Sequence, residues 1–269
     1  MDQRPLDLTH VFQLEAHGPD TFLGESPAYT WGRIYGGLVI AQALWSATQT
    51  VRSEHAVHSL HAYFILGGDP AEPVRYEVDR VRNGRSFSTR RVIARQSAGA
   101  ILTLGCSFQA AEDGPETQSA EVPRAVPAPE SLEPRWDAGI DRRDVELPKA
   151  PPRAWTWARF PEPLGEDPRL QACALAYLSD LNPMNAVAAG HPRELTEKDW
   201  EALMGVSLDH ALWFHRPVRA DDWVLMDLAG HGLIRTRGLA TGPAFMPDGT
   251  HVATIAQECL LRDRRQRPT

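Results

Sequence analysis

The sequence predicts an α+β protein made of two tandem copies of one unit, a helix wrapped by a curved antiparallel β-sheet. Three observations lead to this prediction. A helix pattern followed by four strand patterns occurs twice along the chain, a proline-rich stretch separates the two copies, and residues of the copies match in order. The length of 269 residues, with 42% hydrophobic and 23% charged residues, suits a folded protein of about two domains.

The first copy begins with a glycine-led apolar segment, residues 36–51, which is typical of a buried helix. Four segments of strand character follow it and are separated by glycine-containing turns. These predicted strands are residues 57–66, 73–81, 87–96 and 100–110.

Residues 111–169 form the proline-rich stretch, because eleven of the 22 prolines fall within or at the edge of it. Proline fixes φ and removes a backbone donor, so we expect a linker here without a helix or a central strand. The predicted domains are therefore residues 1–110, a linker of residues 111–169, and residues 170–269.

The second copy repeats the order of the first. Residues 170–181 predict its helix, and its four strands are predicted at residues 206–215, 223–230, 235–241 and 251–261. Residues 57–62 align with residues 206–211 at an offset of 149, which places His58 over Ser207. A serial match through four strands indicates a duplication.

Charge and composition exclude several classes of protein. The net charge is −7, the isoelectric point is near 5.8, and lysine and arginine form no cluster, so we expect no nucleic-acid binding. No apolar segment reaches the roughly 18 residues of a membrane span, and residues 1–5 lack the apolar stretch of a secretory signal. Three unpaired cysteines, Cys106, Cys173 and Cys259, favour a reducing compartment, and we predict a cytoplasmic protein.

Two common catalytic designs are absent from the sequence. His58 and His61, like His210 and His215, fall on opposite faces of predicted strands, so neither pair can chelate, and we predict no metal site. No G-x-S-x-G pentapeptide is present, which argues against the nucleophile elbow of a serine hydrolase.

Polar residues inside expected core segments are the main candidates for a site. Asp180 ends the second helix between Leu178 and Leu181, where its charge opposes the helix macrodipole. A turn formed with Asn182 and Pro183 is an equally valid explanation for this carboxylate. In addition, Gln257 sits in a strand where its amide points inward, and Ser207 opens another strand.

These residues and the segments around them resemble the acyl-CoA thioesterase II family, whose members are double hotdog proteins. The resemblance covers nearly the whole chain. Its markers are residues 32–37 (GRIYGG), 57–64 (VHSLHAYF), 83–92 (NGRSFSTRRV), 179–182 (SDLN), 207–217 (SLDHALWFHRP) and the Gln257-Glu258 pair.

The resemblance implies hydrolysis of acyl-CoA thioesters to fatty acid and CoA by a water that Asp180, Ser207 and Gln257 orient and activate. It implies no covalent intermediate, no cofactor, and a homodimer or homotetramer. Backbone N–H groups of Gly36 and Gly37, at the start of a helix, are candidate donors to the developing oxyanion.

Arginines are the candidate ligands of the CoA phosphates. We name Arg85, Arg90 and Arg91 in the first half, with Arg235 and Arg237 as alternatives in the second. His58 is expected to be a packed polar residue near the pocket. Two other functions remain open: a hotdog hydratase or dehydratase with an Asp and His pair, and an acyl-CoA binding or sensing module with little turnover.

Overall fold

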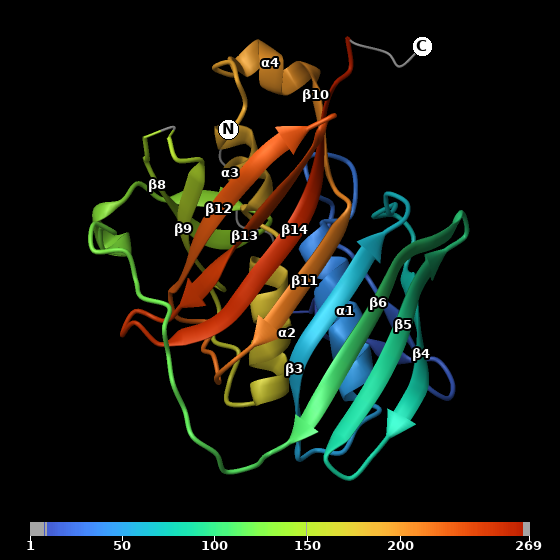
Figure 1. Cartoon of the computed structure of the whole chain (residues 1–269). Helices are drawn as coiled ribbons and strands as arrows, with labels where there is room; N and C mark the ends of the chain where they lie inside the picture. The colour runs from blue at the N-terminus through green and yellow to red at the C-terminus, as the bar shows by residue number, and fades with distance from the viewer. Residues whose placement is uncertain (1–7, 9, 149, 266–269) are drawn as a thin grey trace.

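The computed structural model describes residues 8, 10–148 and 150–265, so the expectation about residues 1–5 lies outside it. Within this part of the chain, all strands join one antiparallel sheet in the order β1-β2-β4-β5-β6-β3-β11-β14-β13-β12-β9-β8-β7, with β10 also paired to β14 (Figure 1). The strands are β1 (Glu15–Ala16), β2 (Thr21–Gly24), β3 (His55–Phe64), β4 (Val74–Asn83), β5 (Phe87–Gln96), β6 (Gly99–Ala110), β7 (Arg135–Asp137), β8 (Ile140–Val145), β9 (Arg153–Arg159), β10 (Leu203–Ser207), β11 (Asp209–Phe214), β12 (Val224–Ile234), β13 (Arg237–Phe245) and β14 (His251–Asp263).

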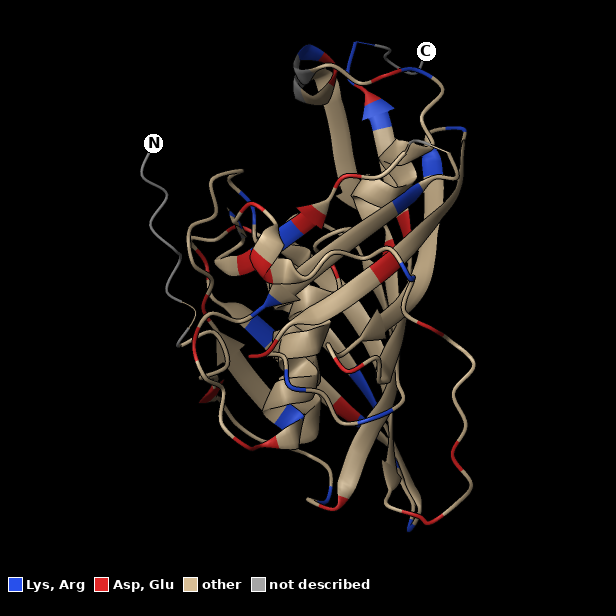
Figure 2. Cartoon of the chain, turned by 90° about the vertical axis from the view of Figure 1, so that its left-hand side faces the viewer, with Lys and Arg blue, Asp and Glu red and all other residues tan. Residues whose placement is uncertain are grey.

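Two helices, α1 (Gly36–Thr48) and α2 (Pro168–Leu178), lie side by side against one face of this sheet (Figure 1). α1 contains no charged residue and α2 contains only Arg169, so both are almost uniformly uncharged in Figure 2. A helix that is apolar all round belongs in the core. The remaining helices are short: the 3₁₀ turn η1 (Pro129–Ser131), α3 (Pro183–Ala189) and α4 (Glu197–Ala202). None of the described helices is both long and apolar enough to cross a membrane.

The sheet is symmetric about the central β3–β11 pair, because equivalent strands of the two copies lie at equal distances from it. In that pair, His61 lies opposite Ala211, with β6, β5 and β4 on one side and β14, β13 and β12 on the other. The prediction of a helix wrapped by an antiparallel sheet, made twice, is therefore confirmed. One hydrophobic core is shared by the two copies, since Leu60 and Leu44 belong to the same cluster as Leu212 and Leu175.

The alignment offset in the central strands is 150 and not the predicted 149. Leu60 and Ala62 are buried in β3, and the buried residues of β11 are His210 and Leu212. The β3–β6 pairing also skips a residue between Val57 and Ser59, as the second copy skips one between Ser207 and Asp209. The placement of His58 over Ser207 is therefore wrong: Val57 is the equivalent of Ser207. A shift of one residue exchanges the two faces of a strand.

Residues 111–169 also differ from the expectation of a linker without a central strand. β7, β8 and β9 extend the sheet beyond β12, and β9 lies between β12 and β8. The prolines stand outside these strands, since residues 135–145 and 153–159 contain none. Proline therefore marks the ends of the added strands and does not interrupt them.

Candidate active site

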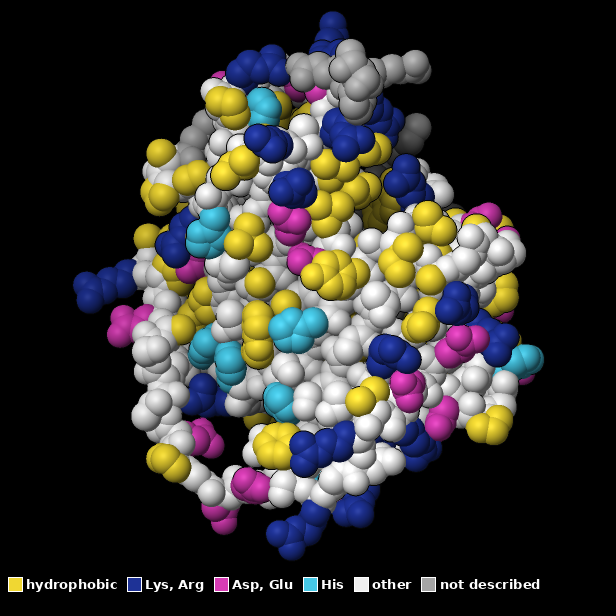
Figure 3. Space-filling view, turned by 45° about the vertical axis from the view of Figure 1, so that its right-hand side comes forward, with side chains coloured by type: hydrophobic (Ala, Val, Ile, Leu, Met, Phe, Trp, Pro, Cys, Tyr) yellow, Lys and Arg dark blue, Asp and Glu magenta, His cyan; other side chains and the backbone are white. Residues whose placement is uncertain are grey.

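A cavity of about 510 Å³ opens where the two copies meet. Its walls come from the N-terminus of α1, the residues after β3, the end of α2, α3 and the strand β10. Figure 3 shows the molecular surface hollowed between the two halves of the sheet, with hydrophobic side chains around the hollow. We call this cavity the active pocket.

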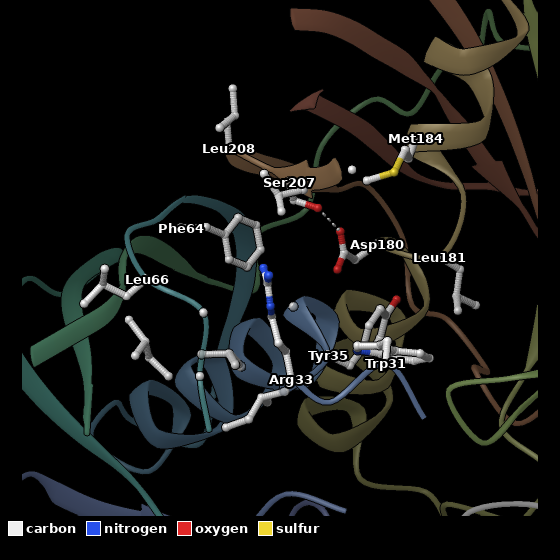
Figure 4. A pocket seen from close by; sticks show the side chains of 18 of the residues that line it. Trp31, Arg33, Tyr35, Phe64, Leu66, Asp180, Leu181, Met184, Ser207 and Leu208 are labelled. Atoms are coloured by element: carbon white, nitrogen blue, oxygen red, sulfur yellow. Dashed lines mark hydrogen bonds between the residues drawn. The ribbon is translucent and has the colours of Figure 1, made fainter. Parts of the chain in front are cut away.

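Asp180 and Ser207 both face the active pocket (Figure 4), and the buried Gln257 bonds Ser207. The Ser207 hydroxyl is 3.0 Å from Asp180 Oδ1 and donates to it, while Gln257 Nε2 donates to Ser207 Oγ over 2.8 Å. The side chain of Gln257 is 1% exposed, and those of Asp180 and Ser207 are partly buried. The structure thus brings together three residues from a helix end and two strands.

The N-terminus of the neighbouring helix α1 explains how a carboxylate is accommodated at the end of α2. Its carboxylate accepts a hydrogen bond from the backbone N–H of Gly37, in the first turn of α1. A helix N-terminus carries partial positive charge, which offsets the unfavourable position of Asp180 at the end of α2. A Cβ atom on Gly36 would lie 2.6 Å from Asp180 Oδ2, so only glycine permits this close approach.

Burial raises the pKa of Asp180 above the ordinary aspartate value. The hydrogen bonds from Ser207, Gln257 and the Gly37 amide act in the opposite direction, as would a positive charge on His210. The carboxylate is therefore a stronger base than one in water, and its neighbours stabilise its ionised form.

His210 continues this chain of donors and was not identified from the sequence. Its Nδ1 contacts Gln257 Oε1, and its Nε2 lies 2.8 Å from the Ser179 hydroxyl. Desolvation lowers the pKa of His210, so the neutral imidazole carries its proton on Nδ1 and donates to Gln257. This donation fixes the amide so that its NH₂ group faces Ser207. Because both ring nitrogens are engaged, His210 does not present the free imidazole of an Asp and His hydratase.

Tyrosines hold the two helices that frame the active pocket. The hydroxyl of Tyr35 donates to the backbone carbonyl of Tyr177 over 3.0 Å, three residues before Asp180. The Tyr177 hydroxyl donates in turn to the carbonyl of Ala138 and contacts the Tyr29 hydroxyl. A Cβ atom on Gly37 would lie 2.4 Å from the same Tyr177 carbonyl, so the first turn of α1 packs tightly on the last turn of α2.

The three arginines named for the first half do not line the active pocket. Arg90 is 1% exposed and donates to Thr50, Asn83 and backbone carbonyls inside the N-terminal copy, so it is a structural residue and not a phosphate ligand. Arg91 is exposed and pairs with Asp79, and Arg85 is exposed on the turn before β5.

The remaining predicted contacts also lie elsewhere. Arg237 pairs with Glu258 over 2.9 Å, and Arg235 occupies an exposed turn with a φ of 47°. His58 lines a different cavity, at the opposite end of β3. Its nearest aromatic neighbour is Phe87, with ring centroids 5.9 Å apart.

Three other arginines do line the active pocket: Arg33, Arg135 and Arg142. Arg142 is buried and bonded to Asp144 and Asn182, and Arg135 pairs with Asp144. Arg33 extends into the pocket (Figure 4) and, among the described residues, forms neither an ion pair nor a hydrogen bond. It stands inside the GRIYGG marker, which was the available signal for it in the sequence.

The three cysteines are free and buried, and burial raises the pKa of each thiol, that of Cys259 to about 12. A thiol with so high a pKa is a poor nucleophile at neutral pH. In the described residues, no group of three or more His, Cys, Asp and Glu side chains is arranged to hold a metal ion.

Comparisons with known proteins agree on one family. A family model described as the acyl-CoA thioesterase N-terminal domain matches residues 25–109, and one described as the acyl-CoA thioesterase C-terminal domain matches residues 112–261. Acyl-coenzyme A thioesterase 8 of Homo sapiens is 32% identical over 98% of this chain and 92% of its own. Acyl-CoA thioesterase 2 of Haemophilus influenzae is 32% identical over 95% of this chain and 97% of its own.

Solved structures show the same relationship. The crystal structure of an acyl-CoA thioesterase II from Mycobacterium marinum superposes with a TM-score of 0.82 at 36% identity, covering 97% of this chain and 98% of that one. A hot dog fold protein from Alicyclobacillus acidocaldarius, at 20% identity and a TM-score of 0.77, shares the fold. The chain therefore belongs to the acyl-CoA thioesterase II family and has its double hotdog fold.

Proposed function

We propose that Asp180, Ser207 and Gln257 activate the water that hydrolyses acyl-CoA in the active pocket. As a member of its family, the chain is a thioester hydrolase that converts acyl-CoA to fatty acid and CoA. The observation that carries the residue assignment is the hydrogen-bonded series Gln257–Ser207–Asp180, which ends on a carboxylate facing the pocket.

In this mechanism, Asp180 accepts a proton from water as the water oxygen attacks the thioester carbonyl. Ser207 binds Asp180 with its proton and accepts from Gln257 with one lone pair, which leaves its second lone pair for the water. The C–S bond breaks as the tetrahedral intermediate collapses. The proton held by Asp180 leaves with the thiolate as free CoA, and the products are a fatty acid and a thiol.

The oxyanion of the intermediate requires donors. The Gly37 amide already binds Asp180, so we assign the oxyanion contact to the Gly36 amide, which lines the pocket at the first position of α1. We assign the CoA phosphates to Arg33, because its guanidinium has no partner among the described residues and enters the same pocket.

The test is release of free thiol from a panel of acyl-CoAs by the wild type and by Asp180→Asn. The amide keeps the shape of the side chain but cannot accept the proton, so turnover should fall by roughly 10²- to 10⁴-fold. Asp79→Asn, on the exposed surface of β4, is the matched control and should hydrolyse at the wild-type rate. Unchanged turnover by Asp180→Asn would refute the assignment.

The same assay tests Arg33 when acyl-pantetheine, which lacks the nucleotide phosphates, is added to the panel. Arg33→Gln should raise KM for acyl-CoA and leave KM for acyl-pantetheine unchanged. Arg91→Gln is the control, since this exposed arginine lies outside the pocket. Equal effects of Arg33→Gln on both substrates would show that Arg33 does not contact the nucleotide.

We also propose that the protein is cytoplasmic and assembles as a homodimer or homotetramer. Its three cysteines are free, which fits a reducing compartment. Tyr63 and Trp213 are 64% and 37% exposed on the central strands, where large apolar side chains favour contact with a second copy. Sedimentation equilibrium measures the assembly, and a monomer at micromolar concentration would contradict it.

A further inference from the structure

The approximate two-fold symmetry of the sheet places a second cavity opposite the active pocket. Residues 64–68 and 205–208 form two walls of the active pocket. Their equivalents at the offset of 150 are residues 214–218 and 55–58, and both segments line a cavity of about 440 Å³. We call this cavity the second pocket.

The helices obey the same symmetry. The active pocket lies at the N-terminus of α1, and the second pocket lies at the N-terminus of α2. At the N-terminus of α1, Gly37 packs on Tyr177 of α2. At the N-terminus of α2, the equivalent contact is Arg169 over the ring of Trp45 in α1, with the guanidinium 5.9 Å from the ring centroid. Helix residues 132 positions apart are therefore equivalent, which makes Thr48 the counterpart of Asp180.

The second pocket lacks the groups that activate water in the first. Val57 takes the place of Ser207, and Cys106 takes the place of Gln257. Leu60 replaces His210, and Thr48 offers a hydroxyl in place of a carboxylate. Without the Asp, Ser and Gln arrangement of the active pocket, we expect no thioester hydrolysis in this pocket.

Groups that recognise an anion surround this apolar wall. Arg169 and Arg216 both line the second pocket, and Arg216 takes the position that Leu66 holds in the first. His58 Nε2 is buried and, in the part of the chain that the structure describes, has no hydrogen-bond partner. A neutral imidazole that carries its proton on Nε2 donates one hydrogen bond from this nitrogen.

Acidic groups near the second pocket are mostly exposed to solvent. Glu54 and Glu112 lie at its exposed rim. Glu116, which is 79% exposed, pairs with Arg216 over 3.4 Å, and Asp167 pairs with Arg169 over 2.8 Å. Asp167 holds Arg169 with two hydrogen bonds of 3.1 and 2.8 Å, and Arg216 also donates to the backbone carbonyl of His251 over 3.1 Å. The pair of Arg216 with the exposed Glu116 is the one that an anion displaces more readily.

We propose that the second pocket binds an acyl chain with an anionic head group and does not cleave it. The apolar wall of Val57, Phe108, Ala172 and Phe214 takes the chain, and Arg169, Arg216 and His58 contact the head group. Free fatty acid and acyl-CoA both have this chemistry, and they are the product and the substrate of the proposed reaction.

The test is the number of ligands bound per chain, measured by titration calorimetry with S-decyl-CoA, a thioether that cannot be hydrolysed. The wild type should bind two molecules per chain. Ala172→Phe, which fills the second pocket, should bind one, and Val39→Phe, which fills the active pocket, should also bind one. One ligand per wild-type chain, or two per Ala172→Phe chain, would overturn the proposal.

Decanoate and decanol distinguish the possible head groups. Filling of the second pocket by decanoate identifies fatty acid as a ligand, and filling by S-decyl-CoA alone identifies the intact coenzyme. Decanol should not fill it, and binding of decanol as tight as that of decanoate would overturn recognition of an anion.

Arg216→Gln provides a second variant that leaves the apolar wall unchanged. It should weaken one of the two binding events by at least fivefold and leave the other at its wild-type affinity. An unchanged isotherm would show that Arg216 does not contact the ligand and would contradict the proposed head-group site. Circular dichroism confirms that each variant is folded before it is titrated.

Discussion

Asp180 is held under two opposing influences that suit the role of base that we propose for it. Burial raises its pKa, while Ser207, Gln257, His210 and the Gly37 amide stabilise its charge. The donors all point in one direction, from His210 through Gln257 and Ser207 to the carboxylate. A base of this kind binds a proton more tightly than ordinary aspartate and yet is ionised when substrate arrives.

The raised pKa predicts the pH dependence of the reaction. Because only ionised Asp180 accepts a proton, kcat/KM should rise with pH through an apparent pKa above the ordinary aspartate value and then level off. A pH–rate profile with a soluble acyl-CoA measures it. An acid limb at or below the ordinary aspartate pKa would contradict this account of the site.

The same shift has a consequence for stability. A group with a raised pKa in the folded state adds stability that is fully present below its unfolded pKa and is lost as the pH rises through its folded pKa. At neutral pH the ionised Asp180 therefore lowers the stability of the fold. Asp180→Asn should raise the melting temperature at pH 7, and the gain should shrink on acidification to pH 4.

His210 acts through Gln257 and is a positioning residue. His210→Leu, which installs the residue found at the equivalent Leu60, should lower kcat by about 10- to 100-fold, since one buried donor is worth roughly 1–3 kcal/mol. KM should change little, and the acid limb of the pH profile should move to higher pH. His210→Asn keeps a donor near the Nδ1 position and should recover most of the activity. Equal losses in both variants would indicate a purely structural role.

At the residue level, the sequence predicted the polar residues of the site but not their partners. Asp180, Ser207 and Gln257 interrupt apolar segments, and this is visible along the chain. The link from His210 to Ser179 joins residues 31 positions apart through a buried strand face, which no local pattern reveals. Arg90 was misjudged for a similar reason, because an arginine in an alternating strand has no mark that distinguishes burial from exposure.

At the level of elements, the N-terminus of α1 is the part of the scaffold that makes the site possible. Its two glycines let α2 and the Asp180 carboxylate approach the first turn. The Gly37 amide of this turn bonds Asp180, and Gly36 lines the pocket. In the proposed mechanism, one element therefore stabilises the base and offers an oxyanion donor.

Gly36→Ala tests this role. Alanine favours a helix by up to about 1 kcal/mol, so the fold should tolerate it. The new Cβ atom would lie 2.6 Å from Asp180 Oδ2 and 2.9 Å from the Phe64 ring, so the carboxylate must move. Turnover should fall by at least 10²-fold with little change in melting temperature. Gly105→Ala, where no atom lies within 4 Å of the added Cβ, is the control and should be fully active.

Element order was readable from the sequence, whereas register and sheet boundaries were not. The offset of 149 failed by one residue because identical residues, Val57 with Val206 and His61 with His210, match at 149, whereas the alternation of buried residues in the paired strands follows 150. The strands β8 and β9 were missed because a count of prolines over sixty residues does not show where the prolines lie, and these prolines lie between the strands.

At the scale of the whole molecule, the two copies form one cooperative unit. β3 and β11 pair through five residue pairs, from Asp209 with Tyr63 to Trp213 with Ser59. In addition, α1 packs on α2, and one hydrophobic cluster contains residues of both copies. Neither copy can unfold without exposing the apolar face of the other. We therefore expect a single calorimetric transition whose calorimetric and van't Hoff enthalpies agree.

Leu60→Ala, at a fully buried position of β3, should cost about 2–5 kcal/mol and lower the midpoint of that single transition by roughly 5–15 °C. The fluorescence of Trp45 in the first copy and of Trp157 in β9, which extends the sheet of the second copy, should report the same midpoint when each is isolated in a variant with one tryptophan. Two separate midpoints, with only that of Trp45 lowered by Leu60→Ala, would mean that the two copies unfold independently and that the shared sheet does not couple them.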